Sequence, residues 1–159
     1  MHEVSNVLID AEIGIARLQR AYADAVTRRD AAALSATATS DCRMIFDTID
    51  DRVIHMDGAE KWGRFAARAL GRFEFYVYTI NNYTFDLTSD TTAQGSTFAH
   101  EVGVLRDTGE VGNYWAMYYD DYVRLDGVWL FSGRRHQATG HKVGDGHMEI
   151  FPLRERPQD

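Results

Sequence analysis

The chain has 159 residues, of which 45% are hydrophobic and 26% are charged, a balance typical of one soluble globular domain. The 17 basic and 24 acidic side chains give a net charge of −7, which argues against nucleic acid as a partner. Cys42 is the only cysteine and cannot form an internal disulfide, and no segment has the pattern of a secretion signal or a membrane span. We therefore expect a cytoplasmic protein with no membrane partner.

The first part of the chain has the periodicity of helices. Between residues 7 and 29, apolar side chains recur with the period of about 3.6 residues that marks a helix with one buried stripe. The expected stripe contains Ile13, Leu18, Tyr22, Ala25 and Val26. Asp30 is suited to cap a short second helix that carries Leu34.

A strand and a third helix are expected next. Residues 42–49 form the first predicted strand, and the turn residues Asp50 and Asp51 lead into a short segment at 53–55. The third helix is expected to begin at 57–58 and to extend through residue 70, where Gly71 is placed to end it. One side of this helix carries Trp62, Phe65, Ala66 and Ala69.

After Gly71 the hydrophobic period changes to two, which is the pattern of β-strands. The expected strands cover residues 73–80, 83–87, 91–105, 111–125 and 128 to about 138. Three helices followed by a meander of long antiparallel strands make an α+β fold. No linker or repeat divides the chain, so we expect a single domain over residues 1–159, with the ends at 1–6 and 148–159 mobile or packed against a partner.

The most informative segment is the predicted hairpin around Asp126-Gly127, a dipeptide that favours a two-residue type I′ turn. Such a turn pairs Leu125 with Val128, Tyr122 with Phe131, Asp120 with Gly133 and Tyr118 with Arg135. Because side chains alternate across a sheet, one face then carries Tyr118, Asp120, Tyr122, Trp129, Phe131 and Arg135. A carboxylate on this aromatic face must find a partner, raise its pKa or face a cavity.

The same hairpin carries a family resemblance. The pattern Tyr118-x-Asp120-x-Tyr122-x-Arg124-x-Asp126-Gly127-x-Trp129 resembles the final hairpin of SnoaL-like proteins, in the nuclear transport factor 2-like superfamily. Residues 125–133 are similar to the corresponding hairpin of scytalone dehydratase, and residues 18–30 resemble the family's first helix and the break after it. The resemblance implies a cone-shaped, curved antiparallel sheet wrapped over three N-terminal helices, with a pocket inside.

Asp120 is the first candidate catalytic residue, and Tyr22 is another. The resemblance implies a pocket histidine or aspartate on the strand of Asp120, as in scytalone dehydratase and bile-acid dehydratases. The alternative is a structural carboxylate paired with Arg135 or Arg124. Tyr22 lies on the buried stripe of the first helix, where relatives supply pocket residues, although a core tyrosine is the alternative.

His100 is the third candidate, because its ordinary pKa suits proton transfer. Together with Asp120 on a neighbouring strand it would resemble a catalytic dyad, whereas the alternative is a hydrogen-bonded structural histidine. The resemblance places the family's histidine nearer Thr97, whose side chain points to the opposite face from His100. A β-bulge between the two positions would be needed to bring His100 to the face of Asp120.

Further residues are expected to line the pocket and to bind the substrate. They are Tyr118, Tyr122, Phe46, Val26, Trp62, Phe65, Arg135, Thr139 and His141. The resemblance implies tyrosines where this chain has Val26 and Phe46, which weighs against scytalone itself as the substrate. The histidines between residues 136 and 147 match no established metal motif, so we expect neither a metal nor a cofactor.

Three functions fit these features. The first is a cofactor-independent enzyme that moves protons beside a carbonyl of a small cyclic or polycyclic hydrophobic molecule, as a dehydratase, isomerase or cyclase. Asp120 and His100 would move the protons, while Tyr22 and Tyr118 would stabilise the enolate. The alternatives are a non-catalytic small-molecule binding protein and an accessory subunit, like the β-subunits of aromatic-ring dioxygenases. The apolar second face of the long strands also predicts a homodimer or homotrimer.

Overall fold

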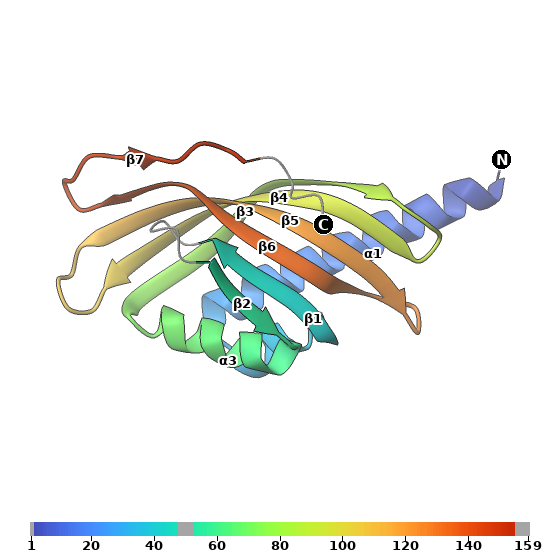
Figure 1. Cartoon of the computed structure of the whole chain (residues 1–159), viewed down its shortest axis with the longest axis horizontal. Helices are drawn as coiled ribbons and strands as arrows, with labels where there is room; N and C mark the ends of the chain where they lie inside the picture. The colour runs from blue at the N-terminus through green and yellow to red at the C-terminus, as the bar shows by residue number, and fades with distance from the viewer. Residues whose placement is uncertain (1, 48–52, 155–159) are drawn as a thin grey trace.

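The computed structural model describes residues 2–47 and 53–154 and has the expected α+β order (Figure 1). The helices are α1 (His2–Arg28), α2 (Ala31–Ser35) and α3 (Ala59–Leu70). The strands are β1 (Ala38–Asp47), β2 (Val53–Asp57), β3 (Phe73–Leu87), β4 (Thr92–Leu105), β5 (Val111–Leu125), β6 (Val128–Val143) and β7 (Glu149–Ile150). The two strands expected at 73–80 and 83–87 are one strand, β3, with a bulge after Ile80. The expected turn at Asp50 and Asp51 lies outside the described residues.

The helix α1 buries one continuous stripe against the sheet. Its buried apolar residues are Ala11, Ile15, Leu18, Tyr22, Ala25 and Val26. Ile13, which was expected in this stripe, is 49% exposed, because steps of three or four residues back from Leu18 reach Ile15 instead. Asp30 caps α2 as predicted, accepting a hydrogen bond from the backbone N–H of Ala33 at 3.0 Å. Among the described residues, no helix is both long enough and apolar enough to cross a membrane.

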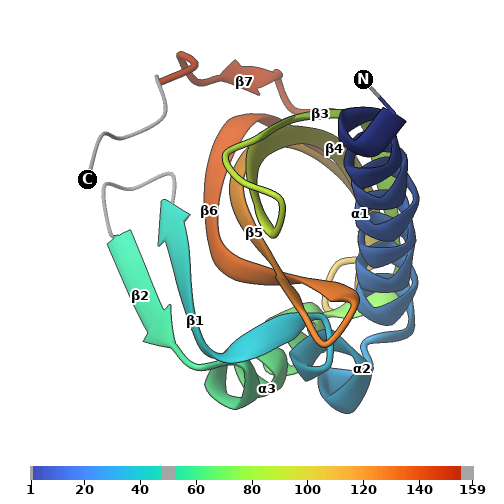
Figure 2. The ribbon, with the colours of Figure 1, turned by 90° about the vertical axis from the view of Figure 1, so that its right-hand side faces the viewer.

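The strands form one sheet in the order β2-β1-β6-β5-β4-β3, with β7 paired to β6. The strands β3 to β6 make the expected antiparallel meander, whereas β1 runs parallel to β6. Viewed end-on, the sheet curls around an interior, with α1 along one side and α2 and α3 beneath it (Figure 2). The predicted α+β fold, with N-terminal helices and a curved, unclosed sheet, is therefore confirmed.

The turn between β5 and β6 has the predicted conformation. Asp126 and Gly127 have φ angles of 49° and 82°, the two left-handed values that a type I′ turn requires. The pairing of Tyr122 with Phe131 is also as predicted. The turn thus fixes the register of the residues nearest to it.

A β-bulge beyond Tyr122 changes the register of the rest of the hairpin. Asp120 lies opposite Arg134, and Tyr118 lies opposite His136, each one position further along β6 than predicted. The bulge turns Arg134, rather than Arg135, to the inner face of the sheet, where Arg134 is 4% exposed. The predicted place of Arg135 on the inner face is therefore wrong.

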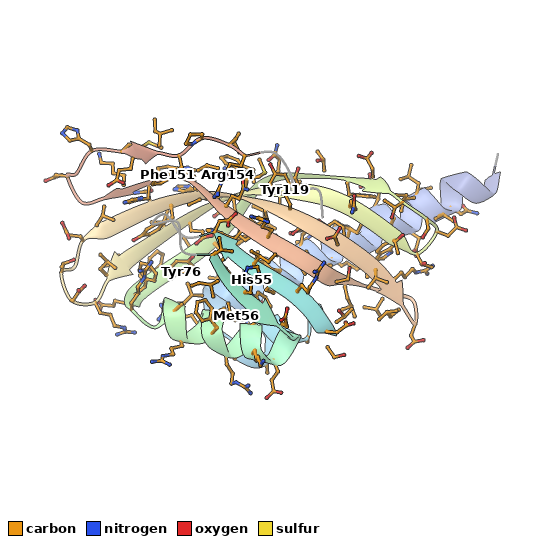
Figure 3. All side chains as sticks on the ribbon, viewed as in Figure 1. His55, Met56, Tyr76, Tyr119, Phe151 and Arg154 are labelled. Carbon is orange, nitrogen blue, oxygen red and sulfur yellow. The ribbon has the colours of Figure 1, made fainter. Side chains whose placement is uncertain are left out.

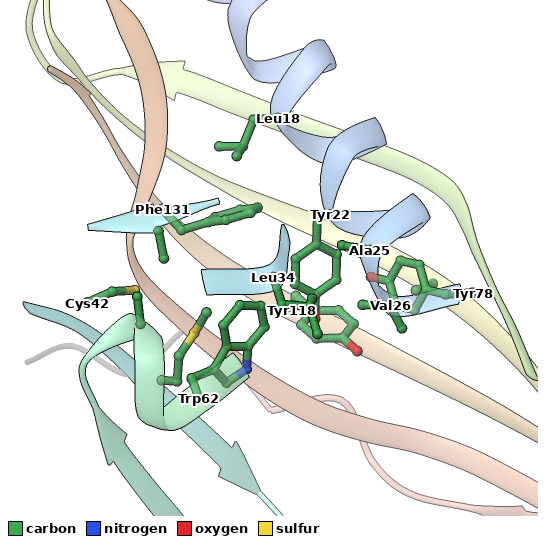
Figure 4. Packing of buried hydrophobic residues seen from close by; sticks show 14 of the residues in the cluster. Leu18, Tyr22, Ala25, Val26, Leu34, Cys42, Trp62, Tyr78, Tyr118 and Phe131 are labelled. Atoms are coloured by element: carbon green, nitrogen blue, oxygen red, sulfur yellow. The ribbon is translucent and has the colours of Figure 1, made fainter. Parts of the chain in front are cut away.

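The core lies between α1, α3 and the concave face of the sheet. Tyr22 projects from α1 and stacks on Trp62 of α3, with ring centroids 5.5 Å apart, and its edge meets Phe131 at 5.7 Å (Figure 4). Burial of each such ring contributes about 1.5–3 kcal/mol. The middle of α1 packs so closely on the β5–β6 hairpin that a Cβ at Gly14 would lie 2.2 Å from Cδ1 of Trp129. Glycine is therefore required at this crossing.

The C-terminal segment folds back along β6. Phe151 stacks on His141, with ring centroids 5.8 Å apart. Tyr119 donates a hydrogen bond of 2.6 Å to the carbonyl oxygen of Arg154, and Figure 3 shows these two residues next to each other. The guanidinium of Arg154 lies 3.4 Å from Oδ2 of Asp47. These contacts tie the segment to β5, β6 and β1.

Candidate active site

A cavity of about 590 Å³ lies between the concave face of the sheet, the C-terminal part of α1, and α3. One wall is apolar and comes mainly from α1, β1, β2 and α3, through Val26, Phe46, Ile54, Phe65 and Leu70. The opposite wall, from β3, β4, β5 and β6, carries the polar residues Tyr76, Tyr78, Glu101, Tyr118 and His136. A volume of this size suits a small-molecule ligand, because ligand pockets in proteins span roughly 300–1,000 Å³.

Glu101 is one of two carboxylates that line this cavity, and the other, Asp47, is paired with Arg135. Glu101 is half-buried on the inner face of β4, and both of its oxygens accept hydrogen bonds. Tyr76 donates to Oε2, and Tyr118 donates to Oε1 at 2.8 Å. Burial, followed by the nearby charge of Glu101, raises the pKa of each tyrosine well above its ordinary value. Both hydroxyls therefore keep their protons at neutral pH and act as donors.

Two further tyrosines extend this polar wall. Burial raises the pKa of Tyr22 to about 12, although Arg134 and a hydrogen bond with Tyr118 act in the opposite direction. Burial likewise raises the pKa of Tyr78, which is 4% exposed. The hydroxyl of Tyr78 has no hydrogen-bond partner among the described residues, although it lines the cavity. This hydroxyl can donate to a ligand oxygen, which would satisfy it.

His136 faces the cavity from β6, one strand away from Tyr118. Its ring meets the ring of Tyr118 edge-on, with centroids 5.1 Å apart, and packs against Phe46 at 5.5 Å. Burial lowers the pKa of His136, and the charge of Arg134 lowers it further, while Glu101 acts to raise it. The imidazole is therefore neutral at neutral pH and can accept a proton.

A buried ion pair lies behind the tyrosines. Nε of Arg134 is 2.9 Å from Oδ1 of Asp120, and the two side chains are 2% and 0% exposed. The guanidinium carbon lies 4.0 Å from the ring centroid of Tyr22, 4.2 Å from that of Tyr118 and 4.4 Å from that of Phe131. Burial disfavours the charge of Arg134, but Asp120 and the tyrosines outweigh this cost and raise its pKa.

The second oxygen of Asp120 is surrounded by donors. Oδ2 accepts hydrogen bonds from Thr97 at 2.8 Å, from Tyr122 at 3.0 Å and from Gln19 at 3.2 Å. Asp120 has therefore found cationic and neutral partners inside the protein, and it does not line the cavity. This network packs behind Tyr22 and Tyr118 and supports them, and Asp120 itself does not contact a ligand in the cavity.

A family model described as a SnoaL-like domain matches residues 8–135, which include the whole of this network. The chain belongs to the SnoaL-like family. The resemblance found in the hairpin sequence is thereby confirmed. No curated protein has significant sequence similarity to this SnoaL-like protein.

Solved structures of similar fold cover nearly the whole molecule. A scytalone dehydratase-like protein of Novosphingobium aromaticivorans is 18% identical, with a TM-score of 0.79 over 97% of this chain and 99% of its own. A hexachlorocyclohexane dehydrochlorinase, LinA-type3 from Novosphingobium barchaimii, is 18% identical, with a TM-score of 0.78 over 93% of this chain and 99% of its own. At this identity the likeness establishes the fold of the SnoaL-like protein.

Six of the residues predicted for the site do line the cavity. They are Tyr22, Val26, Phe46, Phe65, Tyr118 and His141. Asp120 and His100 are not brought together, since His100 lies on the outer face. There its ring stacks on Trp115 at 4.8 Å, and its Nε2 lies 3.0 Å from Oδ1 of Asn113. The β4–β5 pairing has no bulge, so Thr97 rather than His100 shares the face of Asp120.

The other four predicted residues lie beside the cavity rather than in its lining. Trp62 is buried against Tyr22, and Tyr122 donates to Asp120 inside the core. Arg135 pairs with Asp47 at 3.0 Å, because the bulge in β6 turns it away from Asp120. The backbone carbonyl oxygen of Thr139 accepts a hydrogen bond from the backbone N–H of Phe151. Among residues 2–47 and 53–154, no three His, Cys, Asp or Glu side chains lie close enough to hold a metal ion.

Glu101, Tyr76, Tyr78 and His136 were not predicted from the sequence. A signal for Glu101 was present, because the alternation that turns Thr97 inward also turns Glu101 inward, four residues later. Strand alternation likewise places Tyr76 and Tyr78 on one face. His136 could not be found this way, since its position depends on the bulge in the hairpin.

Proposed function

We propose that this SnoaL-like protein is a cofactor-independent enzyme that moves a proton beside a carbonyl group of a small cyclic hydrophobic molecule. The reaction class would be dehydration, isomerisation or cyclisation. The observation that supports it best is Glu101, a carboxylate at a largely apolar cavity whose two oxygens are held by Tyr76 and Tyr118. A base fixed in this way, with tyrosine donors nearby, has the parts that enolate chemistry requires.

Glu101 would act as the base. Each carboxylate oxygen has two lone pairs, so the bonds from Tyr76 and Tyr118 leave one lone pair on each oxygen for a substrate proton. The free hydroxyl of Tyr78 would donate to the carbonyl oxygen and stabilise the negative charge that develops there. In a dehydration, the proton taken by Glu101 would return to the departing hydroxyl group and leave as water.

His136 offers a second proton acceptor at the same cavity. Its lowered pKa keeps the imidazole neutral, and its contact with Tyr118 connects it to the hydroxyl that Glu101 binds. An isomerisation, in which a proton leaves one carbon and returns to another, could use Glu101 and His136 in turn. The two structural relatives are named for the removal of water or hydrogen chloride, and such eliminations also need a base.

The test is exchange of the α-protons of cyclic ketones in D₂O, followed by proton NMR. The panel should include α-tetralone and a fused-ring β-hydroxyketone, for which loss of water is measured by absorbance. Replacing Glu101 with Gln keeps the shape and removes the base, so the rate should fall about 100-fold or more. Glu74→Gln is the matched control, because Glu74 is an exposed carboxylate on the adjacent strand β3.

A wild-type rate that Glu101→Gln leaves intact would refute the assigned base. Ligands that bind in the cavity without any exchange or elimination would instead favour the non-catalytic binding protein. Melting curves of both variants show whether a lost rate reflects lost folding.

A further inference from the structure

A guanidinium group lies at the mouth of the cavity and takes no part in the proposed chemistry. Arg72 precedes β3, is exposed and belongs to the cavity lining. Its guanidinium carbon lies 4.7 Å from the ring centroid of Phe73 and 5.9 Å from that of Tyr114. Within the described part of the chain, no carboxylate forms an ion pair with Arg72.

This packing orients the guanidinium group of Arg72 so that it can bind a ligand. A guanidinium that rests its flat face on aromatic rings keeps the N–H donors at its edge available. Those donors form a planar fork that matches the two oxygens of a carboxylate. Because the protein has a net charge of −7, an anionic ligand is repelled by the molecule as a whole and needs a local cation to bind.

Arg72 and Glu101 line the same cavity, and among the described residues they form no ion pair with each other. Arg72 comes six residues before Tyr78, which pairs with Glu101 in the sheet. Six residues of strand span at most about 20 Å. Tyr114 lines the cavity with them, and both charges act on it: burial raises its pKa, Arg72 lowers it and Glu101 raises it. One ligand in the cavity can therefore contact both Arg72 and Glu101.

We propose that the cavity selects ligands that carry a carboxylate, which Arg72 binds at the mouth. The position of the remainder of the ligand rests on the function proposed above. In that position the ring of the ligand enters the apolar cavity, and the carbonyl group of the ligand reaches Glu101 and Tyr78. Arg72 is then a specificity-determining residue for a cyclic keto acid. Without the carboxylate, the same ring and carbonyl would bind without the ion pair to Arg72.

A matched pair of ligands tests this assignment. The acid is α-tetralone with a carboxymethoxy group on its aromatic ring, and the neutral ligand is its methyl ester. Affinity is measured by isothermal titration calorimetry in wild-type protein, Arg72→Gln, Arg72→Lys and Arg68→Gln. Arg68→Gln removes the same charge from α3 beside the mouth, but Arg68 is not part of the cavity lining.

Wild-type protein and Arg68→Gln should bind the acid about tenfold more tightly than the ester, and added salt should reduce only the affinity for the acid. Arg72→Gln should lose this preference while its affinity for the ester is unchanged, and Arg72→Lys should keep part of it. The proposal is overturned if wild-type protein fails to bind the acid or binds both ligands equally. It is also overturned if Arg68→Gln loses the preference to the same extent, or if Arg72→Gln weakens both ligands equally.

The same samples separate this proposal from the proposed function. Preference for the acid without α-proton exchange would refute the enzymatic role and leave Arg72 as a carboxylate-binding residue. Exchange of both ligands at equal rates in wild-type protein as well as in every Arg72 variant would leave the proposed function intact and refute the role of Arg72.

Discussion

Replacing Asp120 with Asn should destabilise the protein strongly, because Asp120 is the anion of a buried ion pair. Removal of one partner from such a pair costs about 3–5 kcal/mol, since the other charge stays buried. The aromatic rings over Arg134 would reduce this cost. The donors around both oxygens would increase it, because the amide group of Asn would face a donor at one of its two positions. We expect a loss of about 4 kcal/mol.

Urea denaturation followed by circular dichroism measures this loss directly. A domain of this size typically melts about 2–4 °C lower for each kcal/mol lost, so the melting temperature should fall by roughly 8–16 °C. Asp121→Asn is the control, because Asp121 is next in the chain, lies on the other face and accepts a hydrogen bond from Gln94. It should cost no more than about 1 kcal/mol.

The double variant Asp120→Asn with Arg134→Met removes both charges and should recover part of the stability. If Asp120→Asn alone remains within about 1 kcal/mol of the wild type, the charge of Arg134 does not depend on Asp120 and the reasoning fails.

Three other properties should follow from the structure. Burial raises the pKa of the Cys42 thiol to about 12. The folded protein should therefore resist alkylation by iodoacetamide at pH 8, whereas the urea-unfolded chain should react. Equal alkylation rates for the folded and unfolded chains would contradict this. Burial lowers the pKa of His136 below its ordinary 6.5, so the unfolded chain binds the proton more readily and stability should decrease as the pH falls below 6.5. His136→Phe should flatten this dependence in urea titrations, and an unchanged slope would contradict the assignment. We also predict a homodimer or homotrimer that forms through the outer face of the sheet, where Tyr119, Val123 and Leu130 are half-buried. A mass near 18 kDa, measured by light scattering at micromolar concentration, would count against this prediction.

Local signals in the sequence were enough to predict most of the fold. The Asp126-Gly127 dipeptide specifies its turn through backbone conformations that few residues adopt, so its prediction needed no tertiary information. The cap at Asp30 is similarly local. The bulge beyond Tyr122 is different, because Gly133 beside it is a weak local signal that does not fix its position. A bulge depends on how the whole curved sheet closes around its core.

The candidate site was predicted less completely for the same reason. Tyr22 and Tyr118 were found because each lies on a periodic face whose orientation is set locally. Of the three alternatives expected for Asp120, the structure has the paired carboxylate, but its partner is Arg134 rather than Arg135 or Arg124, because of the bulge. The choice of His100 followed its chemistry rather than its position, and strand alternation places it outside. Glu101 was missed although the same alternation points it inward.

The parallel pairing of β1 with β6 has a consequence for the order in which the protein can fold. Phe46 of β1 pairs with His136 of β6, so two walls of the cavity meet only when residues 90 positions apart are joined. Such distant contacts slow folding, because a long loop must close before they form. On the ribosome, β1 emerges early with one edge unpaired and waits for nearly the last strand of the chain. A truncated chain that ends before β6 would therefore have no cavity and would expose the edges of both β1 and β5.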